Sequence, residues 1–375
     1  MDQPSAEPGH EPAPPATGVH LERVEEHGAA VDALAGALGG RADLTDLVGD
    51  LKFTATESRW GRLAGRAVRR AIALDPHDQR DRVWWPQGVT TSADADPSGR
   101  VAGRRLVVLT WYAKAVDGVR RGSRLTFFDL DTLRYRHVLL VEPRLDDEGR
   151  LGLESVRIHA GGIVWAGGWL HVAATARGFL SFRVDDLLRV PDDNARPDEI
   201  GVSDLDGVPR VASFGHHYVL PVRTVHRART DEGHEPLRYS FLSLDRSTSP
   251  PSLLAGEYAR GRQSARLAHF DLDPTSWLPV TDERSVARPV VEDARTLQMQ
   301  GAVVARGRHH VTTSRGPWLP GSVRTGRPDR LRAHHFAVPM GPEDLTYVPQ
   351  TDALWTVTEH PRRRWLVEMR RSWFD

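Results

Sequence analysis

A phrase of two short β-rich runs separated by a turn recurs along most of the chain, and it constrains the fold more than any other feature. Each copy opens on a polar residue, often followed by glycine. No helix-length apolar pattern separates the copies. Such repetition is typical of a β-propeller, in which each copy supplies the inner two strands of one blade. The copies begin near Gln87, His159, His216, Gln300 and Glu343.

Five copies predict an all-β fold, a five-bladed propeller over residues 82–375. Their uneven spacing leaves open a sixth blade between residues 221 and 300. Several copies are followed by a further β-rich run, and we expect these runs to form outer strands. They are residues 125–130, 179–184, 239–244 and 333–338.

The segment before the repeats has a different pattern. Residues 18–81 are expected to form a helical extension, because apolar residues recur at roughly helical spacing in 20–38 and 60–74. The short run 51–56 is a candidate strand that completes the last blade and closes the circle. Residues 1–17, rich in proline and acidic residues, are predicted to be a disordered tail.

Composition and charge exclude several kinds of site. The chain has no cysteine, so disulfides, thiolate nucleophiles and cysteine-based zinc sites are ruled out. Fifty basic residues balance fifty acidic ones, which leaves no net field to attract nucleic acid or an anionic membrane. No apolar stretch approaches the roughly 18 residues of a membrane span. The N-terminus lacks the basic start and apolar run of a signal peptide, which predicts a cytoplasmic protein.

Several segments between residues 84 and 361 resemble a family of uncharacterised actinobacterial proteins that are predicted to be five-bladed β-propellers. Many members are secreted, and this chain departs from the secreted members by lacking cysteines and an evident signal peptide. The resemblance implies the fold and carries no activity, since none is assigned to the family. The matching segments are 85–91 (WPQGVTT), 159–165 (HAGGIVW), 218–221 (YVLP), 239–247 (YSFLSLDRS), 256–258 (GEY), 300–302 (QGA), 341–345 (GPEDL) and 358–361 (TEHP).

In a propeller, equivalent positions of the innermost strands meet around the axis. The residue that opens each repeat is polar, and a ring of amide, imidazole and carboxyl groups suits a small polar ligand. The neighbouring glycines are expected to leave room for that ligand. The alternative is that these polar groups hydrogen-bond to one another and to bridging water in a narrow channel, with no ligand. The predicted ring consists of Gln87, His159, His216 or His217, Gln300 and Glu343.

Within this ring, Glu343 and His159 are the candidate catalytic pair. Desolvation raises the pKa of a carboxyl group and a nearby imidazolium lowers it, so their balance suits acid–base chemistry. The adjacent Asp344 is an alternative exposed partner, because neighbouring residues of a strand face opposite sides.

Three more residues are candidate substrate contacts. Arg177 and Arg315 follow the second strand of their repeats and are placed to clamp an anionic group, or alternatively to form salt bridges between blades. Trp85 is a candidate stacking surface, with core packing as the other possibility.

Two functions of different classes therefore fit the sequence. The first is a metal-independent acid–base enzyme, a hydrolase, lyase or cyclase, acting on a polar small molecule in the central channel. The second is a non-catalytic propeller that binds a glycan or a protein. No cofactor is expected, and no motif for metal or phosphate binding is present. The oligomeric state stays open.

Overall fold

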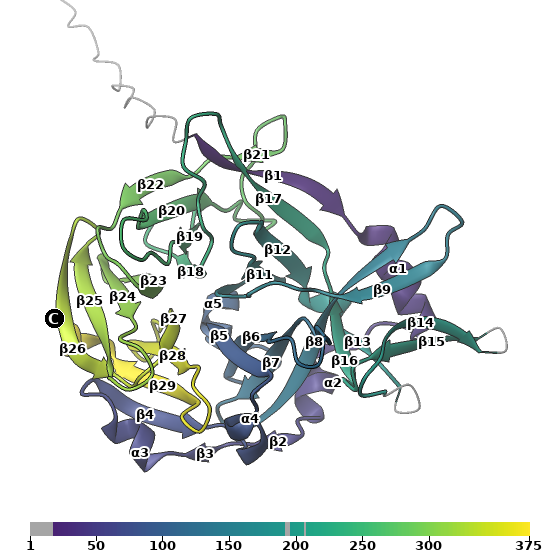
Figure 1. Ribbon diagram of the computed structural model, residues 1–375, viewed down its shortest axis with the longest axis horizontal. Coiled ribbons are helices and arrows are strands. Elements are labelled where there is room, and N and C mark those ends of the chain that lie inside the picture. Colours follow the sequence, from purple (N-terminus) through teal and green to yellow (C-terminus); the bar gives the residue numbers. More distant parts are fainter. Residues whose placement is uncertain (1–17, 192–195, 206–207) are drawn as a thin grey trace, which may run out of the picture.

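Five short strands surround a common axis in the computed structural model, which describes residues 18–191, 196–205 and 208–375 (Figure 1). Each strand contacts the next one along the chain, and the fifth contacts the first, so the ring is closed. The predicted all-β propeller is confirmed. The five innermost strands are β5 (Trp84–Thr91), β10 (Ile163–Ala166), β18 (Phe241–Asp245), β23 (Met299–Ala305) and β27 (Pro342–Val348).

Each innermost strand begins an antiparallel sheet that extends outward as one blade. Neighbouring sheets pack face to face through apolar side chains. These buried apolar layers hold the blades together. In order, the following strands are β6 (Leu106–Ala113), β7 (Ser123–Asp129) and β8 (Arg134–Leu145); β11 (Trp169–Ala173), β12 (Gly178–Arg183) and β17 (Thr224–Thr230); β19 (Ser252–Gly256), β20 (Arg266–Asp271) and β22 (Val290–Asp293); β24 (Arg308–Thr313), β25 (Gly321–Arg327) and β26 (Arg330–Val338); and β28 (Ala353–Thr358) and β29 (Trp365–Arg370).

The N-terminal segment supplies the outer strand of the last blade. β4 (Val68–Ala73) pairs antiparallel with β29, so the two ends of the described chain close the ring. The predicted closing segment 51–56 was wrong in detail: its β2 (Phe53–Thr54) pairs with β8 of the first blade. The backbone groups on the free edge of β29 need hydrogen-bond partners. This requirement places residues 68–73 in a strand, although the apolar residues of 60–74 have helical spacing. Only α3 (Arg59–Leu63) is helical there.

Another strand replaces part of the other expected helix. β1 (Val19–Glu26) pairs with β17 at the outer edge of the second blade, and α1 (Gly28–Ala37) follows it. The alternation of Val19 and Leu21, both buried, with polar neighbours has the period of a strand. The predicted tail, residues 1–17, lies outside the described residues.

The third blade was assigned to the wrong segment. The run that follows His216 is β16 (Tyr218–Pro221), which pairs in parallel with β8 at the outer edge of the first blade. The third innermost strand is β18, within the segment expected to be an outer strand. Both runs are apolar and short, so period and length cannot distinguish them. The described residues contain no sixth blade.

The described chain also contains shorter helices and strands besides those of the five blades. No helix in the described ranges is both long and apolar enough to cross a membrane. The remaining elements are α2 (Leu44–Gly49), β3 (Thr56–Glu57), α4 (Pro76–Arg80), α5 (Ser92–Ala95), β9 (Leu151–Ser155), η1 (Val184–Asp186), β13 (Leu188–Arg189), β14 (Ile200–Leu205), β15 (Val208–Ser213), β21 (Val286–Ala287) and η3 (Arg371–Phe374).

Candidate functional site

Polar side chains gather at one end of the axis, where the innermost strands begin. Gln300 on β23 donates a hydrogen bond from Nε2 to Oε1 of Glu343 on β27, at 3.3 Å. Gln87 on β5 donates from Nε2 to Oε2 of Glu359, also at 3.3 Å. Glu359 follows β28, and its backbone N–H bonds to the carbonyl of Gly341 just before β27. Two amides and two carboxyls from three blades therefore form the core of an axial site.

Tyr112 connects His159 to these carboxyls. It lies near the end of β6, and its ring centroid is 4.4 Å from that of His159, which precedes β10. Burial, then the charges of Glu359 and Glu343, raise the pKa of the Tyr112 phenol to about 12. Tyr112 therefore contacts the tilted ring of His159 on one side and lies in the field of both carboxyls.

The two carboxyls of the axial site have different environments. Burial raises the pKa of Glu343 well above its ordinary value, and the charges of Glu359 and Asp344 raise it further. Burial also raises the pKa of Glu359, but a hydrogen bond from Gln87 and the charges of Lys114 and Arg364 oppose that shift. Glu343 is thus the carboxyl that keeps its proton to higher pH, and Glu359 is the carboxyl more readily ionised.

A surface pocket, here called the mouth, opens beside His159 and Tyr112; Gln87, Gln300, Glu343 and Glu359 do not line it. This pocket of about 360 Å³ is lined by Tyr112, His159, Arg120 and Arg157 among others. His159 reaches solvent through this concavity, while the surrounding protein and the charge of Lys114 lower its pKa and favour the neutral imidazole. The pocket has the volume of a small-ligand site.

Trp85 forms one wall next to this mouth. The Lys114 ammonium lies 3.3 Å from the Trp85 ring centroid, a close cation–π contact. The edge of Trp85 faces His360, with ring centroids 6.3 Å apart. Trp85 therefore shapes the site and positions Lys114, beside its packing role.

The glycines next to the ring have a role that differs from the expected one. A Cβ on Gly162 would lie 2.0 Å from the backbone nitrogen of Leu242, and a Cβ on Gly301 would lie 2.5 Å from that of Leu345. These glycines let neighbouring innermost strands approach each other closely. They fix the diameter of the ring and do not open space for a ligand.

Asp344 is a buried structural carboxyl, and the suggestion of an exposed partner was wrong. It is fully buried, and its Oδ2 accepts hydrogen bonds from the backbone N–H groups of Val89 and Ile163, each at 3.2 Å. These bonds connect β27 to β5 and β10. Burial raises the pKa of Asp344 well above its ordinary value, although the backbone donors oppose the shift.

We expect the Asp344→Asn variant to lose part of the pH dependence of stability while keeping the fold. A carboxyl whose pKa is raised by folding holds its proton longer in the native state. The native protein therefore loses stability as pH rises from the ordinary Asp value of about 4 towards the raised pKa, by about 1.4 kcal/mol for each pH unit between the two. Denaturant unfolding between pH 4 and 8 measures this. Asp344→Ala removes the acceptor and should cost about 1–3 kcal/mol.

An exposed aspartate, Asp271, offers the control. Its Asn variant should unfold like the parent protein at every pH. Parallel stability curves for the parent and Asp344→Asn would contradict a raised pKa for Asp344.

The structure does not bring every predicted site residue to the axis. His216 and His217 line a separate pocket of about 720 Å³ outside the first blade, because the segment carrying them is an edge strand and its preceding turn. Burial and then the charges of Arg124 and His137 lower the pKa of His216 to about 3, so it is a neutral packing residue. Arg177 and Arg315 are exposed in loops after β11 and β24; Arg315 lies over the Phe336 ring.

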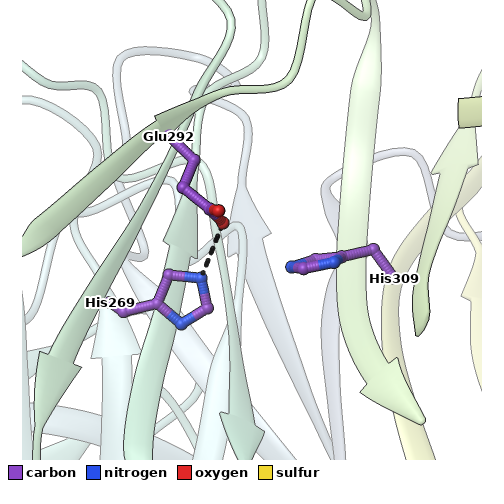
Figure 2. Close-up of side chains that lie close together, drawn as sticks. All are labelled: His269, Glu292 and His309. Atoms are coloured by element: carbon purple, nitrogen blue, oxygen red, sulfur yellow. Dashed lines mark ion pairs between the residues drawn. The ribbon is translucent and has the colours of Figure 1, made fainter. Parts of the chain in front are cut away.

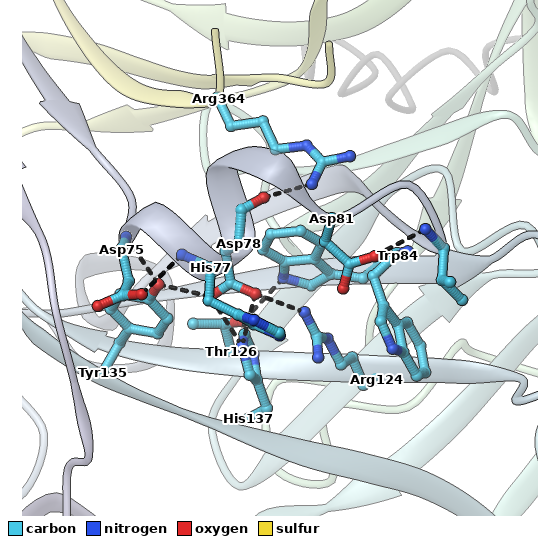
Figure 3. A network of polar contacts seen from close by, with 12 residues as sticks. Asp75, His77, Asp78, Asp81, Trp84, Arg124, Thr126, Tyr135, His137 and Arg364 are labelled. Carbon is cyan, nitrogen blue, oxygen red and sulfur yellow. Dashed lines mark hydrogen bonds and ion pairs between the residues drawn. The ribbon is translucent and has the colours of Figure 1, made fainter. Parts of the chain in front are cut away.

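A buried charge network borders that separate pocket (Figure 3). Asp78 on α4 is fully buried and accepts hydrogen bonds from Arg124 at 2.9 Å and from Tyr135 at 2.5 Å, with His137 Nε2 at 3.0 Å. Burial would raise the pKa of Asp78, but His137, Arg124 and Tyr135 outweigh it and hold that pKa well below its usual range. Arg364 reaches the backbone carbonyl of Asp78 and that of Glu359, joining this network to the axial site.

Sequence reasoning missed Tyr112, Lys114 and Glu359. All three lie at or just after the end of a second strand, next to the start of the innermost strand of the same blade. Arg177 and Arg315 were candidates because of the same position in other blades. The same position after the second strand of the last repeat is occupied by Glu359, within the segment 358–361 (TEHP) that carries part of the family resemblance. Considering this position in every repeat would have identified Glu359.

No protein-family model and no curated protein matches the chain. Among solved structures, the Myceliophteria thermophila Cps50 (Swd1) β-propeller domain is 9% identical, covering 77% of this chain and 98% of its own, with a TM-score of 0.35. The gluconolactonase XC5397 of Xanthomonas campestris is 12% identical over 86% of each chain, with a TM-score of 0.33. A GH43_1 enzyme of Xanthomonas citri is 10% identical, covering 78% and 88%, with a TM-score of 0.32. Likenesses this distant carry no argument about function, and the propeller rests on the arrangement of this chain's own sheets.

Proposed function

We propose that the protein is an acid–base enzyme that converts a polar small molecule at the axial site. The observation that carries this proposal is the pair Glu343 and Glu359, two carboxyls of the axial site whose pKa values are both raised by burial, with opposing hydrogen-bond and cationic groups only around Glu359. Pairs of this kind divide into an acid and a base. A purely structural ring would have no need to hold the buried carboxyl of Glu343 within the field of the partly buried Glu359, since their repulsion is costly.

In this proposal Glu343 donates a proton to the leaving atom of the substrate, and Glu359 accepts one from the attacking or eliminated group. Gln87 and Gln300, already bonded to these carboxyls, orient them. Neutral His159, the predicted partner of Glu343, provides a second proton acceptor at the mouth. Hydrolysis, elimination and cyclisation all use such a set.

The charges around the mouth favour a substrate with an anionic group. Lys114, Arg120 and Arg157 are exposed near the pocket beside His159. A carboxylate on the substrate would lie near these cations while its reacting centre points towards Glu343. Polyhydroxylated acids, their glycosides, and lactones that keep a free carboxylate combine this charge with groups that the two amides can bind.

A second candidate function, glycan or protein binding without catalysis, has its own supporting observation. Trp318, in the loop after β24, is 79% exposed, and the Arg363 guanidinium lies 5.2 Å from its ring centroid. This loop is at the same end of the blades as the axial site, since Thr313 pairs with Met299. An exposed Trp beside an Arg is a frequent anchor for glycans and proteins.

A panel of these acids, lactones and glycosides separates the two functions. Binding is detected by thermal shift and turnover by chromatography, for the parent protein and for Glu343→Gln and Trp318→Ala. The enzyme proposal predicts that Glu343→Gln keeps binding and lowers turnover about 10²–10⁴-fold, while Trp318→Ala changes turnover little.

A compound that binds, is never converted, and is lost in Trp318→Ala but retained in Glu343→Gln would support the binding module and overturn the enzyme. Turnover unaffected by Glu343→Gln would also overturn the assigned role of that residue.

A further inference from the structure

Three side chains with metal-ligand chemistry converge between the third and fourth blades, away from the axial site. They are His269 on β20, Glu292 on β22 and His309 on β24 (Figure 2). One ligand atom from each lies within 4.8 Å of the other two. They come from three strands of two sheets, so no sequence spacing reveals them.

Strand register directs these side chains towards one point. His269 pairs with Val290, and Glu292 is two residues further along β22, so both side chains lie on the same face of the sheet. His269 Nε2 is 3.5 Å from Glu292 Oε2. His309 reaches across from the next blade with its ring edge directed at the other two, and the His269 and His309 rings are 6.1 Å apart at 89°.

The unused hydrogen-bonding capacity of His309 is a second observation. Its Nε2 is buried and has no hydrogen-bond partner among the residues that the structure describes. A buried imidazole nitrogen without a partner is costly, and a metal ion satisfies it.

A carboxylate supports the ligand set from behind. Asp245, with a side chain only 3% exposed, has its Oδ2 3.9 Å from the Nδ1 of His269, the ring nitrogen facing away from Glu292. Its Oδ1 is fixed by hydrogen bonds from the backbone N–H and hydroxyl of Ser247, at 2.8 and 2.6 Å. At 3.9 Å this is an electrostatic contact and not a hydrogen bond, so Asp245 favours a positive charge near His269 without fixing its tautomer.

We propose that His269, Glu292 and His309 bind one zinc ion, with water as the fourth ligand. Two imidazoles and one carboxylate favour zinc over calcium or magnesium, which prefer oxygen ligands. Tetrahedral zinc with bonds near 2.0–2.1 Å places its ligand atoms roughly 3.3 Å apart. His269 and Glu292 already have nearly this separation, and a small rotation of His309 completes it. The ion would join the third and fourth blades, since His269 and Glu292 belong to one and His309 to the other.

Zinc titration of the chelator-treated full chain by calorimetry tests the proposal. We expect one zinc per chain in the parent protein, and binding weakened at least about 100-fold in His309→Ala and Glu292→Gln, because either change leaves two protein ligands. His335→Ala, an exposed histidine on β26 of the same blade, is the matched control and should bind like the parent. Zinc should raise the melting temperature of the parent and the control, and not that of His309→Ala.

Glu292→Gln alters a partly exposed side chain and should leave the fold intact, which separates loss of the site from loss of structure. Absence of stoichiometric binding in the parent, or equal binding in parent and both ligand variants, would overturn the proposal. Neither result bears on the axial carboxyls, since the two sites share no residue.

Discussion

A protein that begins at residue 84 will not form a stable propeller. This truncation removes β4 and leaves the backbone of β29 unpaired along its outer edge. It also removes buried side chains of the core, among them Leu21, Leu34 and Ile72. Each fully buried aliphatic side chain contributes about 1.5–3 kcal/mol, whereas a whole domain is stable by only about 5–15 kcal/mol. Circular dichroism should therefore show no cooperative thermal transition.

The matched control is a protein that begins at Gly18, which keeps every described element. Its melting temperature should agree with that of the full chain. A truncated protein beginning at residue 84 that melts cooperatively near the parent temperature would contradict closure of the ring by β4, and would show that residues 82–375 fold alone.

Replacing Asp78 by alanine should destabilise the protein by about 3–5 kcal/mol, the largest effect we expect of a single substitution. The change leaves the buried guanidinium of Arg124 without its carboxylate, since the side chain of Arg124 is only 6% exposed. Tyr135 and His137 lose the same partner. Urea denaturation measures the change in the free energy of unfolding.

The exposed Asp147→Ala variant should unfold within about 0.5 kcal/mol of the parent. Adding Arg124→Met to Asp78→Ala should recover part of the loss, because the unpaired charge is then gone. A cost below about 1 kcal/mol for Asp78→Ala, or no recovery in the double variant, would show that the network is not tightly coupled.

The sequence was sufficient to predict the propeller because each repeat carries its own turn and two strands. It located the openings of four innermost strands to within a few residues, through Gln87, His159, Gln300 and Glu343. The third blade has no such polar opening, since β18 begins at Phe241, and the repeat pattern matched His216 instead. Local pattern cannot distinguish an innermost strand from an edge strand when both are apolar and short.

The sequence indicates that a further strand must complete the last blade, but it does not identify the segment that supplies this strand. The free edge of the last blade requires a partner. Choosing β4 over residues 51–56 depends on tertiary position: a Cβ on Gly65 would lie 2.7 Å from the backbone of Val338, so this segment is held closely against the neighbouring blade. Helical spacing in residues 60–74 pointed elsewhere because two arginines interrupt the strand pattern.

For the site, the innermost strands identified half of the residues. Second-strand ends supply Tyr112, Lys114 and Glu359, and these residues give the two carboxyls their different environments. The Asp78 network could not be predicted, because Asp78 lies 46 or more residues before its partners and meets them only through the packing of α4 against β7 and β8.

Measuring the protonation state of Glu343 shows whether the axial site holds an acid, and the measurement requires no substrate. Infrared difference spectra between the parent protein and Glu343→Gln isolate the carboxyl band of this side chain, with Asp344→Asn as the control that identifies its buried neighbour. We expect Glu343 to stay protonated at pH values at which ordinary carboxyls have ionised, because burial raises its pKa. A Glu343 that ionises with an ordinary carboxyl pKa of about 4.3 would contradict the assignment of Glu343 as the acid of the axial site.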